Sequence, residues 1–162
     1  MENLIETTGL CKRYEDFSLE GVNLTVPAGT IVGLIGENGA GKTTTLKTLL
    51  GMVQPTQGSA RLLGRAPGDP EALAQVGVVF EDAYFCETMC AEQIDKVMAR
   101  VYSNWDSSLF RDYCRRFELS GKQPLKEFSR GMRMKLSLAT ALAHRPRLLI
   151  LDEATSGLDP VV

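Results

Sequence analysis

Three short runs of apolar residues stand out along the chain. They cover residues 31–36 (IVGLIG), 76–80 (VGVVF) and 147–152 (RLLILD). Apolar runs of this length, without polar alternation, are typical of strands that are buried on both faces of a parallel sheet. Residues 4–27 alternate loosely and are rich in turn residues, which predicts two or three antiparallel strands there, followed by a turn at residues 27–29.

Helical patterns separate these predicted strands. Residues 43–50 predict a helix that Gly51 closes, and a second, short helix is expected over residues 70–75. Residues 59–63 predict a further strand. Strands that alternate with helices predict an α/β fold with a mostly parallel sheet, to which the early strands add an antiparallel β piece.

The second half of the chain is mostly helical in character. From residue 81 to about 123, aromatic, cysteine and charged residues mix at helical spacing, which predicts a separate helical subdomain. Ser129 then precedes a helical run that ends near His144. The apolar positions of this run are expected on one face.

Composition narrows the class of protein. The 162 residues include 18 Lys and Arg and 20 Asp and Glu, so the formal net charge of −2 does not suggest a nucleic-acid partner. The longest apolar runs are far shorter than the roughly 18 residues of a membrane span. The first residues are acidic and lack a basic segment, so we expect no signal peptide and a cytoplasmic protein.

A glycine-rich loop follows the first apolar run. Residues 36–43 match G-x-x-x-x-G-K-[ST] in full, between a predicted strand and a predicted helix. Glycines let backbone N–H groups surround phosphate oxygens, a lysine reaches the β- and γ-phosphates, and a hydroxyl holds Mg²⁺. The expected contacts of a nucleotide are Gly36, Glu37, Asn38, Gly39, Ala40, Gly41, Lys42, Thr43 and Thr44, with Lys42 also aiding catalysis and Thr43 binding the metal.

Two carboxylates follow the last apolar run. Asp152 ends the predicted strand, and Glu153 comes next. The carboxyl ends of parallel strands lie at the same sheet edge as a phosphate loop, so Asp152 is expected to hold Mg²⁺. Glu153 is expected near the γ-phosphate, where it would polarise the attacking water.

A third motif points to a family. Residues 125–132 (LKEFSRGM) precede the helix that leads to the predicted strand of residues 147–152, here called the magnesium strand because Asp152 ends it. Residues 154–160 (ATSGLDP) follow that strand. This order resembles the nucleotide-binding domain of ABC-type ATPases, in which a signature loop opens the helix and a D-loop follows the strand. The resemblance covers nearly the whole chain and implies a P-loop NTPase core of the RecA-like kind.

The resemblance implies roles for further residues. Ser129 and Gly131 would contact the γ-phosphate that the opposite subunit binds, and Tyr14 would stack on adenine. Glu81 stands where the family has a glutamine that reaches the metal, and a carboxylate there can still bind Mg²⁺. The signature loop also departs from the family, since Arg130 replaces its first glycine and Met132 its glutamine.

The family's switch histidine, which follows the D-loop, is missing, so the chain is expected to lack the C-terminal part of the domain. The single histidine, His144, precedes the magnesium strand. Its place near a helix C-terminus predicts an interaction with the helix dipole. The whole chain, 1–162, is then one ABC ATPase domain, with a β and phosphate-loop part at 1–80, a helical subdomain at 81–128 and the signature helix, magnesium strand and D-loop at 129–162.

The resemblance implies an ATP- and Mg²⁺-dependent subunit that powers an ABC membrane transporter of the exporter branch. Its partners would be a transmembrane permease and a second ABC ATPase subunit, identical or different, in a head-to-tail dimer at the inner face of the membrane. No nucleic acid is expected. Two alternatives stay open at this point: a soluble ABC-type ATPase of translation or DNA repair, and a nucleotide-binding regulator that does not hydrolyse ATP.

Overall fold

The computed structural model describes residues 2–80 and 85–152. The chain divides into two compact units, Met1–Leu73 and Ala74–Val162, and each is described by itself. Within the described residues, no helix combines the length and the apolar character that crossing a bilayer requires.

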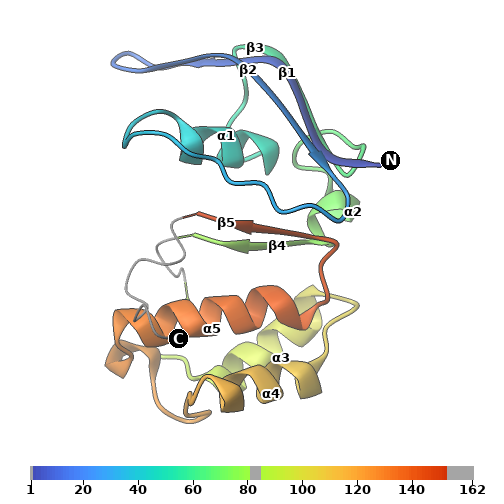
Figure 1. The fold of residues 1–162 in the computed structure, drawn as a ribbon. Coiled ribbons are helices and arrows are strands. Elements are labelled where there is room, and N and C mark those ends of the chain that lie inside the picture. Colours follow the sequence, from blue (N-terminus) through green and yellow to red (C-terminus); the bar gives the residue numbers. More distant parts are fainter. Residues whose placement is uncertain (1, 81–84, 153–162) are drawn as a thin grey trace. The chain divides into compact units, whose positions relative to one another are not determined.

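The first unit is built on a three-stranded antiparallel sheet in the order β2-β1-β3 (Figure 1). Its strands are β1 (Asn3–Arg13), β2 (Ser18–Pro27) and β3 (Gln57–Leu62). In the central strand, Ile5 faces Val26 on one side and Leu62 on the other. The antiparallel strands predicted for residues 4–27 are therefore confirmed.

Two helices complete the first unit: α1 (Lys42–Leu49), which contacts β3, and the short α2 (Pro70–Leu73). Gly51 ends α1 as predicted, because its φ of 74° turns the chain and its N–H donates to the carbonyl of Thr48. A side chain at this position would also collide with the backbone of Gly68, 2.5 Å from the place of a Cβ atom.

The strand predicted for residues 31–36 is wrong. These residues form no regular element, and the side chains of Ile31 and Ile35 are fully exposed. A strand exists only where its N–H and C=O groups bond to a neighbouring strand. Within the first unit the central strand β1 already has β2 and β3 on its two edges, and the segment pairs with none of the three. An apolar pattern alone therefore did not make this segment a strand.

The second unit contains a two-stranded parallel sheet of β4 (Val76–Val79) and β5 (Leu148–Leu151). Val76 pairs with Leu148 and Val79 with Leu151. Both strands were predicted from their apolar runs, and the parallel pairing confirms the fold class for this part of the chain.

The other regular elements described in the second unit are helical, as predicted. They are α3 (Ala91–Val101), α4 (Ser107–Arg116), the 3-10 turn η1 (Leu125–Glu127) and α5 (Arg130–Ala143). The helix α5 is buried on two sides. Leu136 and Ala139 pack with the helical core, while Met134 and Ala141 pack on Val79 of β4.

Candidate functional site

The glycine-rich loop runs directly into α1. Gly41 caps the helix with a φ of 91°, a left-handed conformation that favours glycine. A Cβ atom on this residue would lie 2.6 Å from Leu19 and 3.0 Å from the ring of Phe17. Both the backbone conformation and the packing of β2 and its preceding turn therefore require glycine at this position.

The side chain of Lys42 lies inside the loop. Its ammonium group donates to the carbonyl oxygens of Gly36, at 2.8 Å, and Glu37, at 2.9 Å. The N–H of Ala40 also donates to the carbonyl of Glu37, at 3.1 Å, which closes a tight turn. The first N–H groups of a helix have no partners within the helix and carry a partial positive charge. A fixed cation beside a helix N-terminus suits a polyphosphate.

The loop is open to ligands and poor in carboxylates. All residues from 31 to 40 are exposed, and so is Thr43 at the start of α1. The described residues contain no group of three or more His, Cys, Asp or Glu side chains that could hold a metal ion. Mg²⁺ commonly binds through one or two protein ligands together with substrate phosphates. The loop offers the Thr43 hydroxyl as a metal ligand, which fits a magnesium ion that arrives with a nucleotide.

Tyr14 lies at the turn between β1 and β2, in the same unit as the loop. Its N–H donates to the carbonyl of Phe17, at 2.8 Å, and the residue is 47% exposed. Lys12 lies over the ring, 5.2 Å from its centroid. Phe17 touches the position of Gly41, so this turn borders the phosphate loop. Lys12 would have to leave one face of the ring, or a base would have to use the other face, for this half-exposed aromatic side chain to stack on a base.

Phe17 and Leu19 were not predicted as site residues. Their contact with Gly41 joins positions more than twenty residues apart, and neither belongs to a motif. The only signal in the sequence was the cluster of aromatic residues within this turn.

Asp152 follows β5 in the second unit. Its N–H donates to the carbonyl of Val79, at 2.8 Å, so the residue lies beside the carboxyl end of β4. The residue is 8% exposed. Glu81, the other predicted metal ligand, follows β4 by two residues. Glu81 and the predicted base Glu153 both lie outside the described residues.

The predicted signature loop opens α5. The hydroxyl of Ser129 accepts the N–H of Met132 at 3.2 Å, which is the expected N-cap. Gly131 lies in the first turn. Arg133 holds the preceding segment, since its guanidinium group pairs with Glu87 at 3.0 Å and donates to the carbonyl of Phe128 at 3.4 Å. Ser129 is therefore held at a helix N-terminus, where partial positive charge gathers.

His144 does not make the expected charge–dipole interaction. It caps the C-terminus of α5, but its ring is buried and stacks on Tyr102 with centroids 4.3 Å apart. Burial lowers the pKa of His144 below its usual value of 6.5, so the imidazole is neutral near pH 7. A neutral ring carries no charge for the dipole to stabilise.

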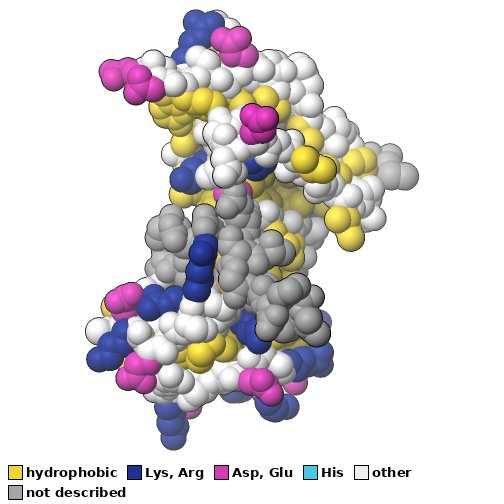
Figure 2. Space-filling view, turned by 60° about the vertical axis from the view of Figure 1, so that its left-hand side comes forward, with side chains coloured by type: hydrophobic (Ala, Val, Ile, Leu, Met, Phe, Trp, Pro, Cys, Tyr) yellow, Lys and Arg dark blue, Asp and Glu magenta, His cyan; other side chains and the backbone are white. Residues whose placement is uncertain are grey.

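The arginines of α4 pair with acidic residues of the helical part. Arg111 pairs with Asp95, at 3.2 Å, and both Arg115 and Arg116 pair with Asp112. On the face drawn in Figure 2, basic and acidic side chains are mixed rather than separated by sign. This pattern is typical of a solvated surface.

Known proteins are similar to this chain over a region that contains these motifs. A family model described as ABC transporter matches residues 19–156. The chain is 36% identical to the bacitracin transport ATP-binding protein BcrA of Bacillus licheniformis, covering 99% of this chain and 54% of that protein. It is 37% identical to the lantibiotic transport ATP-binding protein SrtF of Streptococcus pyogenes, covering 88% of this chain and 62% of that protein.

Among solved structures, the ATP-binding subunit of an ABC transporter is similar, with a TM-score of 0.87 and 30% identity over 98% of this chain and 69% of that one. The chain spans about half the length of the curated relatives it matches, for example 54% of BcrA.

Proposed function

The chain belongs to the ABC transporter family of ATP-binding domains, and we propose that it binds ATP with Mg²⁺ and hydrolyses it to power a membrane transporter. The observation that carries this proposal is the position of Lys42. Its ammonium group lies within an exposed glycine-rich loop at the N-terminus of α1, 2.8 Å from the carbonyl of Gly36. A cation held there, beside backbone N–H groups, matches the charge of a triphosphate.

Six of the predicted site residues have separate roles in this proposal. Lys42 would exchange its carbonyl partners for phosphate oxygens, and Tyr14 would stack on adenine. Thr43, Asp152 and Glu81 would hold Mg²⁺, which neutralises charge on the phosphates when bound. Glu153 would orient and deprotonate the water that attacks the γ-phosphate.

The partners of the chain follow from its relatives. BcrA and SrtF carry the names of transport ATP-binding proteins, and a third relative, from Streptomyces peucetius, is a daunorubicin/doxorubicin resistance ATP-binding protein. We infer that the chain belongs to an exporter, at the cytoplasmic face of the membrane. It would pair with a permease and with a second ABC ATPase subunit, head to tail. In this dimer, Ser129 and Gly131 would face the γ-phosphate bound by the partner subunit.

The same relatives favour a transporter over a soluble ABC ATPase of translation or DNA repair. The other alternative is a nucleotide-binding regulator that does not hydrolyse ATP. An assay must distinguish it from an ATPase, because both would bind ATP through the same loop.

The test compares ATP binding with ATP turnover. Glu153→Gln should bind ATP with Mg²⁺ as the unchanged chain does and should lose on the order of 10²-fold or more in kcat, since an amide is a far weaker base. Glu20→Gln makes the same chemical change at an exposed position of β2, and this variant should hydrolyse ATP at the normal rate. Equal single-turnover rates for Glu153→Gln and the unchanged chain would contradict the proposed role. ATP binding without any turnover in the unchanged chain would favour the regulator.

A further inference from the structure

Two stretches that are far apart in the sequence lie side by side just before α5. The N–H of Leu125 donates to the carbonyl of Met89, and the N–H of Lys126 donates to the carbonyl of Glu87, both at 2.9 Å. These bonds join η1 to the segment that precedes α3. The predicted signature loop follows η1 directly, so its place depends on residues 87–89.

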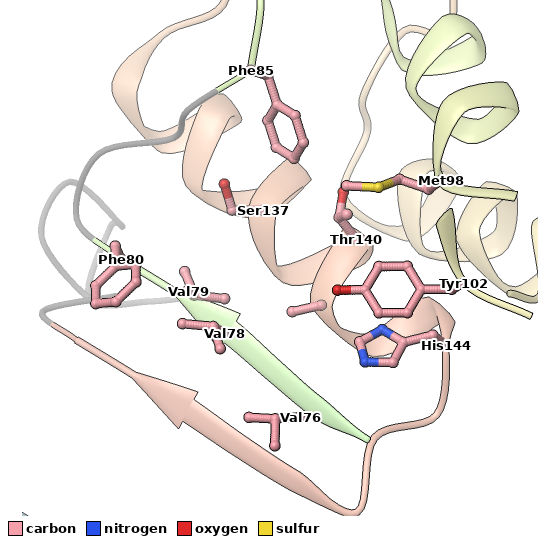
Figure 3. Close-up of a pocket in the computed structure, with 11 residues that line it drawn as sticks. Val76, Val78, Val79, Phe80, Phe85, Met98, Tyr102, Ser137, Thr140 and His144 are labelled. Atoms are coloured by element: carbon pink, nitrogen blue, oxygen red, sulfur yellow. The ribbon is translucent and has the colours of Figure 1, made fainter. Parts of the chain in front are cut away.

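The segment that carries Glu87 is itself anchored at both ends. Phe85 packs against the helical core, and it lines the same cavity as Ser137 of α5 (Figure 3). Cys90 is the N-cap residue of α3. Residues 85–90 are therefore held by the helical part of this unit, and they can support the loop beside them.

One arginine connects this segment to the signature loop. Arg133 lies near the start of α5, and its guanidinium group pairs with the carboxylate of Glu87 at 3.0 Å. Its Nε–H donates to the carbonyl of Phe128, at 3.4 Å, and its backbone N–H donates to the carbonyl of Ser129, at 3.0 Å. Because a guanidinium group is planar and presents its N–H groups in fixed directions, the pairing with Glu87 also orients the bond to Phe128.

Ser129 lies within these contacts. The residue is exposed, whereas Phe128 before it is buried, so hydrogen bonds rather than packing hold the serine. Its hydroxyl accepts the N–H of Met132 at 3.2 Å, and Arg133 binds its carbonyl and that of the residue before it. A shift of about 1 Å in a group that contacts reacting atoms is enough to slow a reaction. The bonds of Arg133 therefore matter for any role of Ser129 at a phosphate.

The pair of Glu87 and Arg133 contributes to geometry more than to stability. The side chain of Glu87 is 65% exposed and that of Arg133 is 28% exposed. Ion pairs at such positions add little to the free energy of unfolding, because water and salt screen them. Breaking this pair should leave the fold unchanged and loosen only the loop.

We propose that Glu87 is a positioning residue for ATP hydrolysis. Through Arg133, its carboxylate holds Ser129 where the proposed function requires it, facing the γ-phosphate bound by the partner subunit. The inference rests on that proposed function and adds to it a residue that belongs to none of the motifs.

The test measures ATP binding, turnover and stability of the full-length ATPase subunit. Glu87→Gln removes the charge but keeps the length of the side chain. It should bind a fluorescent ATP analogue with Mg²⁺ as the unchanged protein does, because the phosphate loop is untouched. Its kcat should fall about threefold, as expected for the loss of an exposed ion pair. The urea concentration at the midpoint of unfolding should not change.

Two further variants show whether the effect belongs to the pair. Glu92→Gln makes the same chemical change five residues later, at an exposed position of α3 that forms no ion pair with any described residue, and its kcat should be normal. Arg133→Gln should lower kcat at least as much as Glu87→Gln does. In the Arg133→Gln background, Glu87→Gln should cause no further loss, because the pair is already broken.

Four results would overturn the inference alone. They are an unchanged kcat in Glu87→Gln, the same loss in Glu92→Gln, an equal effect of Glu87→Gln with and without Arg133→Gln, and a lower urea midpoint in Glu87→Gln, which would assign the pair to stability. Failure of the proposed function looks different, since the unchanged protein would then bind ATP without hydrolysing it.

Discussion

The ammonium group of Lys42 lies 2.8 Å from the carbonyl oxygen of Gly36, the first residue of the phosphate loop. A second hydrogen bond, to the carbonyl of Glu37, holds the cation on the same side of the loop. The lysine thus closes the loop on itself. Because these bonds fix the side chain near the helix N-terminus, little ordering remains to be done when phosphate binds.

Replacing Lys42 by alanine should weaken the binding of ATP with Mg²⁺ by at least about tenfold, since it removes the charge-assisted hydrogen bonds to phosphate. Titration with a fluorescent ATP analogue measures this loss. Lys47→Ala is the matched control, because it removes the same charge from the last turn of the same helix. Unchanged affinity in Lys42→Ala would contradict the assignment of the loop.

Glu81 stands where the family has a glutamine, and the effect of this difference on metal binding can be tested. If its carboxylate lies near the bound metal, it attracts Mg²⁺ and repels a bare polyphosphate. Glu81→Gln should then reduce the preference for metal-bound over metal-free ATP, with the fold unchanged. The measurement is ATP affinity with and without Mg²⁺ in both forms. An equal effect of Mg²⁺ in both would make Glu81 a surface residue at the end of a strand.

Ser129 should contribute to stability as well as to ligand binding. Its hydroxyl accepts the N–H of Met132 at the start of α5. Ser129→Ala should lower the free energy of unfolding by about 1 kcal/mol, whereas Ser129→Asp should retain the cap. Urea unfolding of the three forms measures the difference. Equal losses in both variants would mean that the cap is not the cause.

His144 should make the chain less stable in mild acid. Its folded pKa lies below the unfolded value of 6.5, so the unfolded chain binds more protons between these two values. The stability due to the neutral ring is complete above pH 6.5 and is lost as the pH falls from there toward the folded pKa. In the unchanged chain, the urea concentration at the midpoint of unfolding should be lower at mildly acidic than at neutral pH. In His144→Phe this difference should be smaller. An unchanged pH dependence in that variant would assign the effect to other groups.

The sequence by itself determined the local elements and the chemistry of the loop. The apolar runs of β4 and β5 predicted parallel strands, and their pairing confirms this. Burial on both faces was predicted as well, but in β5 only Leu148 and Ile150 are buried, while Leu149 and Leu151 are exposed. Gly41 and Gly51 were recognisable because only particular backbone conformations join a loop to a helix. Ser129 was recognisable because its hydroxyl bonds to the chain three residues later.

The tertiary structure decided what depends on contacts between distant positions. The apolar residues of segment 31–36 form no strand, because pairing rather than hydrophobicity makes a strand. Phe17 and Leu19 reach Gly41 only through the folding of the first unit. His144 looked like a charged residue at a helix end, but packing against Tyr102 buries it, and burial is what removes its charge.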